Sequence, residues 1–428
     1  MNAADTTWML LATAMVLLMT PALAFFYGGL VRSKNALNTM MMSLISLGFV
    51  GMAWAMLGYT LAFGHGSHLL GDLSAFGLRG IGLDPAPGST IPSLLFAAYQ
   101  GAFAIITAAL ISGAVVGRMR FLPYITFITL WSLVVYSPVA HWVWGGGWLA
   151  RIGAMDFAGG TVVHITAATA ALVAALVVGP RKDFARHAVL PHNIPFTILG
   201  AGLLWFGWFG FNGGSALAAN GQAVLAFVNT LLAPSATLVA WTILDQVRTG
   251  KVTAVGAATG IVVGLVAITP AAGFVSPFSA MTIGALAAFP SYFAILYRSR
   301  TRLDDSLDVV AAHGFGGTTG ALLTGVFAQK AWGAPADGLL FGNPRQLLVQ
   351  AIAVGSTILF TLALTAALLK LAALLAALKA APQEEGQGMD VSQHGEEAYT
   401  SGDGALLLLS ETLPGQEPGL AASQGGAQ

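Results

Sequence analysis

Long apolar runs alternate with short polar joints over most of the chain. Eleven of these runs are long enough to be helices that cross a bilayer, which takes about 20 mostly apolar residues. The joints contain charged residues, glycine or proline, which interrupt helices. The pattern therefore predicts an all-α polytopic membrane protein with eleven transmembrane helices, near residues 7–31, 40–63, 93–117, 123–143, 157–179, 196–218, 223–247, 253–271, 277–298, 308–330 and 346–378.

The basic residues gather on one side of these predicted helices. Of the 18 Lys and Arg residues, 14 follow odd-numbered runs or close the last run, and only Arg79, Arg151, Lys330 and Arg345 fall on the other side. Loops rich in Lys and Arg stay in the cytoplasm. We therefore expect a multi-pass protein of the cell inner (plasma) membrane, with its N-terminus outside and its C-terminus cytoplasmic. The first run lacks preceding positive charges, which disfavours a cleaved signal peptide.

Composition supports this class and narrows the chemistry. The chain is 56% hydrophobic and 8% charged, where an ordinary soluble domain carries roughly 25% charged residues. It has no cysteine, which excludes disulfides and thiolate metal sites. All of its glutamates follow residue 383, so the predicted membrane body uses aspartate alone. We expect no cofactor, no resident metal ion and no nucleic-acid partner.

Two histidines lie inside predicted membrane helices. His164 ends the stretch DFAGGTVVH that begins with Asp156, and His313 lies in AAHGFGGTTGALLTG. An ionisable side chain at mid-membrane costs roughly 2.5–3.5 kcal/mol on insertion scales and usually faces a protein interior or a pore. A cut between residues 180 and 195 leaves five predicted helices in each half, with one histidine in the last of each. Because five is odd, the halves would form an inverted repeat, with the eleventh helix peripheral.

The chemistry of these groups leaves several interpretations open. A single buried histidine is often only a hydrogen-bonded core residue. Two imidazoles without a cysteine or glutamate do not complete a tetrahedral metal site. Two neutral imidazoles that share a proton suit a narrow pore, where they offer a hydrogen-bond acceptor and a proton relay. Asp156 fits a helix N-cap, and it also fits a source of negative potential for a cation site.

Aromatic residues cluster at the outer ends of the predicted helices. Most aromatic rings at such positions form interfacial belts. Here tryptophans flank a triple glycine, and a ring face beside a serine hydroxyl is suited to capturing a weakly hydrated cation. The clusters are Tyr99 and Phe103; Trp142, Trp144 and Trp148; and Trp205, Trp208, Phe209 and Phe211, followed by Ser215.

These residues resemble those of the ammonium transporter family (Amt/Mep/Rh), in particular its bacterial Amt branch. The resemblance runs from about residue 8 to residue 400 through several long motifs in order. They are FYGGLVRSKN, AHWVWGGGWL, DFAGGTVVHI, GPRKDF, PHNIPF, WFGWFGFNGGSA, AFVNT, ITPAAGFVSP, AAHGFGGTTGALLTG and GMDVSQHGEEAY.

The resemblance implies a homotrimer in the lipid bilayer, with one pore in each subunit. It also implies a role for each matching residue. Phe103, Trp144 and Ser215 would form the outer ammonium site with Asp156 below it, Phe103 and Phe211 a phenyl gate, and His164 with His313 and Trp208 the pore. Tyr99 stands in the vestibule where many members of the family have Phe.

The implied function is an ammonium/ammonia channel-transporter and not an enzyme. Ammonium would be recruited at the outer aromatic site, lose a proton and pass the histidines as ammonia. Residues 1–379 would form the transport domain and 380–428 a cytoplasmic regulatory tail. The tail motif GMDVSQHGEEAY resembles the segment to which a PII-type signalling protein docks. Residues after 401 have no counterpart in the family and are expected to be flexible.

Two other classes compete with this interpretation. The first is an ammonium sensor or receptor that signals through its cytoplasmic face, but the tail is too short for a fused signalling domain. The second is an intramembrane hydrolase that uses Asp156 and the histidines. The sequence does not support it, because no second membrane aspartate, Ser/Lys dyad or metal motif lies near Asp156. A variant closer to the main interpretation is conduction of ammonia or carbon dioxide, as in the Rh branch of the family. Trp144 and Ser215 disfavour it, because they would build a cation site.

Overall fold

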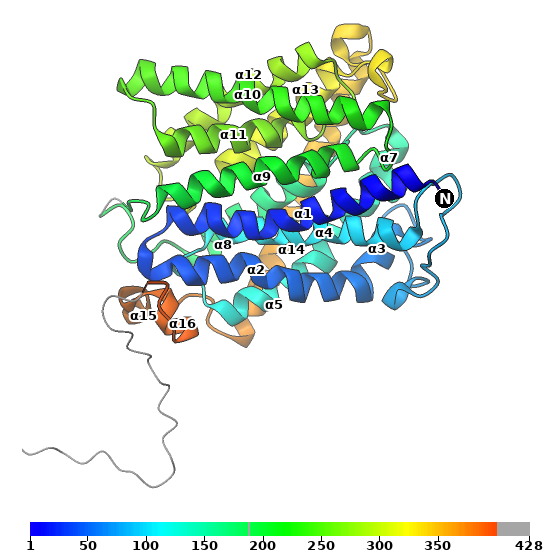
Figure 1. The fold of residues 1–428 in the computed structure, drawn as a ribbon. Coiled ribbons are helices and arrows are strands. Elements are labelled where there is room, and N and C mark those ends of the chain that lie inside the picture. The colour runs from blue at the N-terminus through cyan, green and yellow to red at the C-terminus, as the bar shows by residue number, and fades with distance from the viewer. Residues whose placement is uncertain (187–188, 400–428) are drawn as a thin grey trace, which may run out of the picture.

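The computed structural model describes residues 1–186 and 189–399, and these residues form helices and loops without a β-strand. The long helices lie side by side and run between the same two ends of the molecule (Figure 1). Nine helical stretches in the described residues are long and apolar enough to cross a membrane: Ala3–Leu30, Ser33–Phe63, Ser93–Ala114, Phe121–Ile152, Gly160–Val178, Ile194–Gly214, Gly221–Thr249, Pro277–Arg298 and Pro344–Leu375. The prediction of an all-helical membrane protein is therefore confirmed.

The first half of the chain contains several helices that change geometry partway. The elements are α1 (Ala3–Leu30), α2 (Ala36–Ala53), η2 (Trp54–Gly58), α3 (Tyr59–Phe63), α4 (Ser93–Ile111), η4 (Ser112–Ala114), α5 (Phe121–Trp131), η5 (Ser132–Tyr136), α6 (Ser137–Val143), α7 (Trp148–Ile152), η6 (Gly160–Ile165) and α8 (Thr166–Val178). Among these, η2, η5 and η6 are π-helical. Such wider turns are uncommon and often occur at functional sites.

The second half has longer, more regular helices and ends in two short ones. They are α9 (Ile194–Gly214), α10 (Gly221–Thr249), α11 (Ala254–Ile268), α12 (Pro277–Arg298), η7 (Val310–Phe315), α13 (Gly316–Phe327), α14 (Pro344–Leu375), α15 (Pro382–Gln387) and α16 (Met389–His394). Short 3-10 turns lie at Ser33–Asn35, Phe76–Leu78, Lys330–Trp332 and Leu339–Phe341.

All eleven predicted runs overlap a helix, but two of them fall short as membrane spans by length and composition. One is α11, which is apolar but shorter than the nine spans. The other combines the π-helical η7 with α13, and it is rich in glycine and threonine. The count of eleven spans, the inverted relation of the two halves and the outside position of the N-terminus therefore stay predictions.

Local sequence explains where the helices of the second half begin. Asn193, Asn220 and Thr253 each accept a backbone N–H of the first turn with their side chains. Side-chain acceptors of this kind satisfy amide groups that have no partner within the helix. At α12, Ser276 caps the helix and Pro277 occupies its first turn, where the missing N–H costs nothing.

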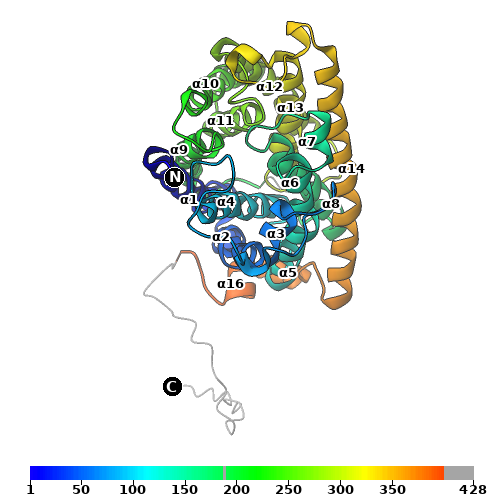
Figure 2. The same cartoon turned by 90° about the vertical axis from the view of Figure 1, so that its right-hand side faces the viewer.

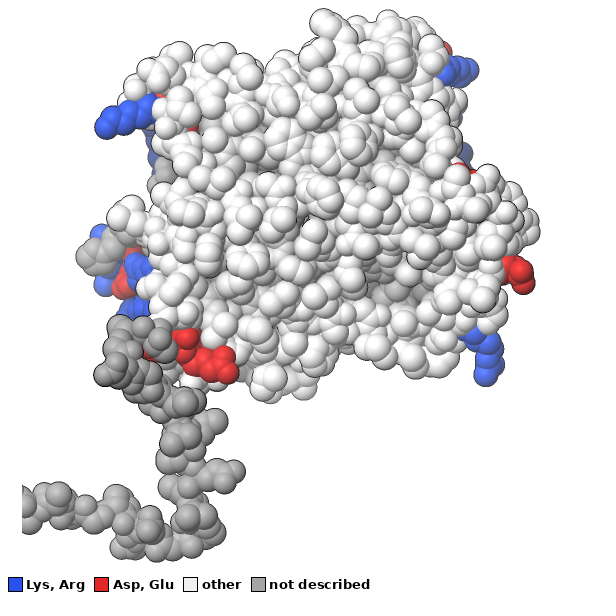
Figure 3. All heavy atoms as spheres, in the orientation of Figure 1, with Lys and Arg blue, Asp and Glu red and all other residues white. Residues whose placement is uncertain are grey.

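The surface separates apolar and charged residues along the helix direction. In Figure 3 charged atoms appear at the two ends of the molecule, and the broad band between them is uncharged on the face shown. Large exposed apolar side chains include Leu10, Phe206, Val239 and Leu359 on α1, α9, α10 and α14. A wide uncharged band of this kind matches the hydrocarbon layer of a bilayer or a contact with another subunit.

Helix α14 departs from the common direction. It runs obliquely along one side of the bundle (Figure 2) and packs against α13, α8 and α5. Its buried side chains recur every three or four residues and include polar ones, Gln346, Gln350, Thr357, Thr361 and Thr365. The eleventh predicted helix is therefore external, yet it has one polar stripe that faces the bundle.

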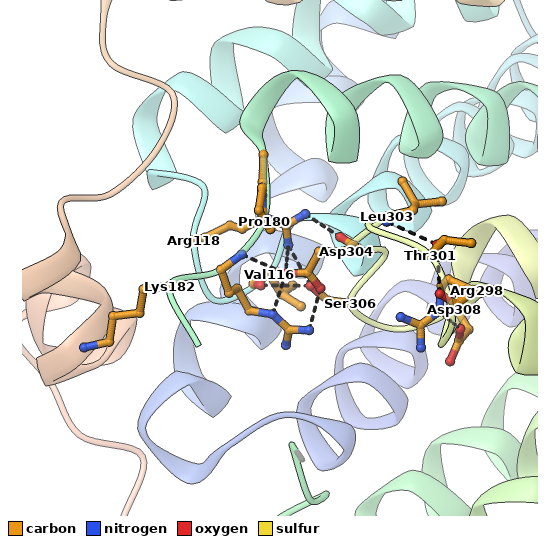
Figure 4. Close-up of polar contacts among 12 residues, drawn as sticks. Val116, Arg118, Pro180, Lys182, Arg298, Thr301, Leu303, Asp304, Ser306 and Asp308 are labelled. Atoms are coloured by element: carbon orange, nitrogen blue, oxygen red, sulfur yellow. Dashed lines mark hydrogen bonds and ion pairs between the residues drawn. The ribbon is translucent and has the colours of Figure 1, made fainter. Parts of the chain in front are cut away.

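A buried ionic network joins the two halves at the end that carries α15 and α16. Arg118, which follows α4, donates to the carbonyl oxygens of Gly179 (2.6 Å) and Asp304 (2.5 Å) and to Ser306 Oγ (2.7 Å). Arg181 donates to both carboxylate oxygens of Asp304, at 2.9 and 2.6 Å. Figure 4 shows Arg118, Asp304 and Ser306 meeting between segments that are far apart in the sequence.

The charges in this network compensate one another. The side chains of Arg118 and Asp304 are fully buried. Burial alone would raise the pKa of Asp304, but hydrogen bonds from Arg181 and the charge of Arg118 hold it below its usual value. Asp304 therefore stays ionised and cancels buried positive charge.

We predict that Asp304→Asn strongly destabilises the protein. Removal of one member of a buried ion pair leaves the other charge uncompensated and costs about 3–5 kcal/mol. The measurement is the apparent melting temperature of the purified protein in detergent. Arg120→Met is the matched control, because the Arg120–Glu384 pair is partly exposed and worth about 1 kcal/mol or less. Equal melting temperatures for Asp304→Asn and the wild type would contradict the account.

Candidate functional site

The two membrane histidines meet at the centre of the bundle. Their Nδ1 atoms lie 3.2 Å apart, and the rings face each other with centroids at 5.2 Å and an angle of 26°. Both side chains are buried, with His164 1% and His313 3% exposed. Two nitrogens at this distance form a hydrogen bond only if one carries the proton and the other accepts it. A hydrogen bond between the two rings therefore requires one imidazole to carry its proton on Nδ1 and the other to present an unprotonated Nδ1.

Each histidine lies in a π-helical turn at the beginning of its helix. His164 is in η6 and His313 is in η7. In both cases an aspartate lies eight residues earlier, Asp156 and Asp305, and accepts backbone N–H groups at the start of that turn. The repeated spacing of aspartate and histidine was visible in the sequence, but only its first copy was singled out there. The two halves thus build their histidine turns in the same way.

Asp156 is a helix cap of unusual completeness. Its Oδ1 accepts the N–H groups of Gly159 and Gly160 at 2.8 and 2.7 Å, and its Oδ2 accepts those of Thr161 and Val162 at 2.8 and 3.1 Å. These are four amides that the first turn of a helix otherwise leaves without partners. The structure thus gives Asp156 the capping role that the sequence favoured in part.

The glycine pair after Asp156 is required by space and by backbone conformation. Gly159 has a φ of 118°, and a Cβ there would meet a methyl group of Val163 at 2.6 Å. A Cβ on Gly160 would lie 2.6 Å from the ring of Pro270. Only glycine allows the chain to turn this sharply into η6 while passing so close to its neighbours.

Asp305 has a less complete set of partners. Its Oδ2 accepts the N–H of Val310 at 2.8 Å, while its buried Oδ1 has no partner among the described residues. Burial, followed by the negative charge of Asp308, raises the pKa of Asp305. Asp308 pairs with Arg298, the last residue of α12. The second histidine turn therefore rests on a carboxylate that ionises less readily than an exposed aspartate.

The predicted outer residues come together around two aromatic rings. Phe103 and Trp144 are in edge-to-face contact, with centroids 6.0 Å apart. The indole N–H of Trp144 donates to the carbonyl oxygen of Asp156 at 2.9 Å. Ser215 Oγ donates to the carbonyl of Phe211 at 2.8 Å, so the oxygen itself can act as a hydrogen-bond acceptor.

Tyr99 lies behind this group and ties α4 to α9. Its hydroxyl is within hydrogen-bond distance of the carbonyl oxygens of Gly210 and Phe211, at 3.0 and 2.8 Å, and of Ser215 Oγ at 3.3 Å. The side chain is fully buried. The hydroxyl group, which a Phe at this position would lack, therefore hydrogen-bonds to the backbone of the segment that carries Ser215.

The predicted gate residues separate the outer group from the histidines. The rings of Phe103 and Phe211 stack with centroids 4.1 Å apart, at an angle of 26°. On the other side of Phe211, His164 stacks on Trp208 at 5.4 Å, and the Trp208 indole N–H donates to Thr269 Oγ1 at 2.9 Å. Thr269 was not recognised from the sequence. It fixes the indole plane against which His164 lies.

Beyond the stacked rings, a narrow apolar cavity reaches the histidine pair. Its volume is about 10 Å³, close to the minimum for one water-sized molecule. Its walls are mainly aliphatic and aromatic: Met19, Leu23, Phe26, Ile106, Leu110, Val163, His164, Leu204, Trp208, Phe211, Val262 and His313.

A second, wider cavity begins on the other side of His313. It has a volume of about 430 Å³ and a lining that includes Tyr27, Arg181, Asp308, His313 and Glu385. Its walls are thus much more polar than those of the narrow cavity. His313 borders both spaces, and so the histidine pair stands at the boundary between a narrow apolar cavity and a wider polar one.

The described residues contain no cluster of three or more His, Asp or Glu side chains that suits a metal ion. With Asp156 held by four amides, the accessible polar groups along this line are the two imidazoles and the hydroxyl of Ser215. Such a line offers hydrogen-bond acceptors and aromatic faces to a small solute. It offers no nucleophile with an activating base.

Comparisons with known proteins agree on one family. The family model described as Ammonium Transporter Family matches residues 7–399. An ammonium transporter of Bacillus subtilis is 46% identical over 402 residues, which cover 93% of this chain and 99% of the relative. The crystal structure of Mep2 from Saccharomyces cerevisiae is similar with a TM-score of 0.85 and 36% identity, covering 90% of this chain and 89% of Mep2. A structure titled Sensor Amt Protein has a TM-score of 0.85 and 30% identity, covering 91% and 98%.

We predict that Asp156→Asn destabilises the fold more than Asp305→Asn. An asparagine has one acceptor oxygen, so two of the four amides held by Asp156 would lose their partner. Each buried amide without a partner costs about 1–3 kcal/mol. Asp305→Asn keeps an acceptor for Val310 and is the matched control. Melting temperatures in detergent measure the difference, and a smaller loss for Asp156→Asn than for Asp305→Asn would refute the capping argument.

Proposed function

The chain belongs to the ammonium transporter family, and on that premise we propose that it carries ammonium across the membrane as ammonia, past His164 and His313. The observation that carries this proposal is the histidine pair at the end of a narrow apolar cavity, directly below two stacked phenyl rings. A charged ion that loses its hydration in such a passage pays a far larger free-energy cost than a small neutral base does.

Recruitment would occur at the outer aromatic group. Phe103 and Trp144 present ring faces and edges, and Ser215 Oγ can act as a hydrogen-bond acceptor. A desolvated cation over an aromatic face gains about 0.5–2 kcal/mol. Ammonium gains further from hydrogen bonds to acceptors, since it has four N–H groups. Asp156 adds negative potential nearby, although its own hydrogen bonds are all used for the cap.

Selectivity against potassium would follow from a proton transfer, in which ammonium at the outer aromatic group gives one proton to water on that side and continues as neutral ammonia. Potassium has a similar size and the same charge as ammonium, but it has no proton to give up and must remain charged in the narrow cavity. The stacked rings of Phe103 and Phe211 fill the passage, so a solute enters only when they move apart. A neutral molecule then meets imidazole nitrogens that offer an acceptor and a donor in the shared-proton state.

The same contacts support transport rather than catalysis. The matching family model and the Bacillus subtilis relative are both named for ammonium transporters, and these are not enzymes. The intramembrane hydrolase considered from the sequence would need an activated nucleophile, and Asp156 is held by four backbone amides.

An ammonium sensor is the second candidate, and the likeness to the Sensor Amt Protein structure favours it. That likeness is at 30% identity, against 46% for the Bacillus subtilis transporter. In a sensor, binding of ammonium must change the conformation of the cytoplasmic face, but ammonium need not cross the membrane. Transport measurements therefore separate the two candidates.

Assembly as a homotrimer is part of the proposal. The wide uncharged band leaves large apolar side chains on several helices exposed in the single chain (Figure 3). Lipid covers part of this surface, and contacts between three copies would cover another part. Each copy would keep its own pore, because the histidine pair lies inside one chain.

A PII-type signalling protein would bind at the face that carries the tail. Asp390 of α16 accepts the N–H groups of Leu37 and Asn38, at 3.1 and 2.7 Å. Lys34 donates to the carbonyl oxygens of Glu385 and Gly386. Glu385 also lines the polar cavity that reaches His313, so a protein docked on the tail would lie over the exit of the pore. The predicted flexible part of the tail, after residue 401, lies outside the described residues.

We predict saturable uptake of labelled methylammonium by proteoliposomes that contain the purified protein. The double variant His164→Ala, His313→Ala should lower the uptake rate about tenfold or more, which corresponds to about 1.4 kcal/mol in the barrier. The physical reason is that no hydrogen-bonding group then remains between the phenyl rings and the polar cavity. His68→Gln, a change in an outer loop, is the matched control and should transport like the wild type.

Two results would contradict this prediction. Uptake no greater than that of protein-free vesicles would reject transport and favour the sensor. Saturable uptake with the same rate in the double histidine variant would retain transport but reject the histidine pair as its path.

We further predict that a PII-type protein from the same organism binds the full chain in a nucleotide-dependent manner. Truncation after residue 379 should abolish binding, because α15 and α16 are then missing, while methylammonium uptake continues. Co-purification with ATP or ADP measures this. Binding that survives the truncation would place the partner elsewhere, and no binding with either nucleotide would reject the regulatory proposal.

A further inference from the structure

Two glutamines on α14 point into the bundle from its most external helix. Gln346 and Gln350 are four residues apart, which places them on the same face. They are 5% and 1% exposed. A buried amide side chain in a membrane helix is costly unless it is fully hydrogen-bonded, so its partners reveal its role.

Gln350 forms a closed amide pair with the backbone of Met155. Its Oε1 accepts the Met155 N–H at 2.8 Å, and its Nε2 donates to the Met155 carbonyl at 2.7 Å. The same Nε2 donates to the carbonyl of Ala321 in α13 at 3.0 Å. Gln346 supports the preceding turn by donating to the carbonyl of Gly153 at 2.9 Å. The segment 153–155 is thus bound to α14 through its main chain.

The hydrogen bonds leave Gln350 a single arrangement. Both of its N–H bonds and its carbonyl oxygen are engaged, and a rotated amide would place like groups opposite each other at Met155. The side chain also packs closely against Gly325, where a Cβ, had the residue one, would lie only 2.9 Å from Gln350 Cγ. A fully satisfied buried network of this kind specifies one geometry.

Met155 is directly joined to the outer aromatic group. The next residue, Asp156, accepts the Trp144 indole N–H with its carbonyl oxygen and caps η6 with its carboxylate. On the far side, the Phe157 N–H donates to the carbonyl of Pro270 at 3.1 Å. The carbonyl that orients Trp144 therefore lies between two fixed points, of which Gln350 supplies one.

We propose that Gln350 is a positioning residue for ammonium recruitment, which acts from α14 through Met155 on the Trp144–Asp156 contact. The inference rests on the proposed function, and it extends that function to the external helix α14. By fixing Met155, Gln350 holds the carbonyl oxygen of Asp156 in the position where it accepts the Trp144 indole N–H. That hydrogen bond keeps the Trp144 ring edge-on to Phe103. Without the amide pair, the segment 153–156 shifts and the outer site loses its shape.

The test compares Gln350→Met and Gln350→Glu with the wild type in methylammonium uptake by proteoliposomes. Methionine keeps the volume and removes every hydrogen bond, while glutamate keeps the acceptor for the Met155 N–H and opposes the Met155 carbonyl. Both should raise the apparent KM about fivefold, the size expected when a misplaced Trp144 ring weakens its contact with the cation, with a maximal rate within twofold of the wild type.

Thr357→Val is the matched control. Thr357 lies seven residues further on the same buried face of α14, and its Oγ1 has no hydrogen-bond partner in the described part of the chain. This change should leave both KM and the maximal rate unaltered. A combination of Gln350→Met with Trp144→Leu should have nearly the same KM as Trp144→Leu alone, because the two residues act in series.

A readout that needs no transport is hydrogen exchange of the peptide 153–160. Exchange should become faster in Gln350→Met than in Thr357→Val. The proposal is overturned if the exchange is unchanged, if both Gln350 variants keep a KM within twofold of the wild type, or if the KM effects of Gln350→Met and Trp144→Leu multiply. If the wild type itself shows no saturable uptake, the proposed function is rejected. Hydrogen exchange does not depend on transport, so it still tests whether Gln350 holds the segment 153–156.

Discussion

Buried carboxylates that hold the first amides of two helices are the constraint on which this site depends. Asp156 engages four backbone N–H groups and Asp305 engages that of Val310, and each lies eight residues before one member of the buried histidine pair. A helix that begins inside a bilayer would otherwise leave these groups without partners, at a cost of several kcal/mol each. The caps therefore permit two helices to start inside the bundle and to bring the Nδ1 atoms of His164 and His313 within 3.2 Å of each other.

The same caps explain why the cavity beside the histidines is narrow and apolar. Because the amides are satisfied by side chains of the chain itself, no water is needed along η6, and Gly159 and Gly160 let the backbone pass close to its neighbours. The remaining space is an apolar cavity of about 10 Å³. Polar groups return only beyond His313, where the wide cavity and the ionic network around Arg118 and Asp304 begin (Figure 4). The change from a narrow apolar cavity to a wider polar one thus occurs at the histidine pair.

Much of the fold could be predicted from the sequence, since membrane helices are specified by length and hydrophobicity within one segment. The candidate residues Asp156 and His164 were visible because ionisable groups in apolar runs are rare. Gln350 and Thr269 were not found, because a neutral polar residue in such a run gives no signal until its partner is known. Their partners, Met155 and Trp208, are distant in sequence. The role of α14 was missed for the same reason.

The central claim is that a neutral molecule passes the histidines while a potassium-sized cation does not. Uptake of radioactive rubidium, which replaces potassium, and of methylammonium in the same proteoliposomes tests this claim most directly. The account predicts saturable methylammonium uptake, unaffected by a large excess of rubidium, and rubidium uptake no greater than in protein-free vesicles. Rubidium uptake through the protein at a rate comparable to that of methylammonium would contradict it.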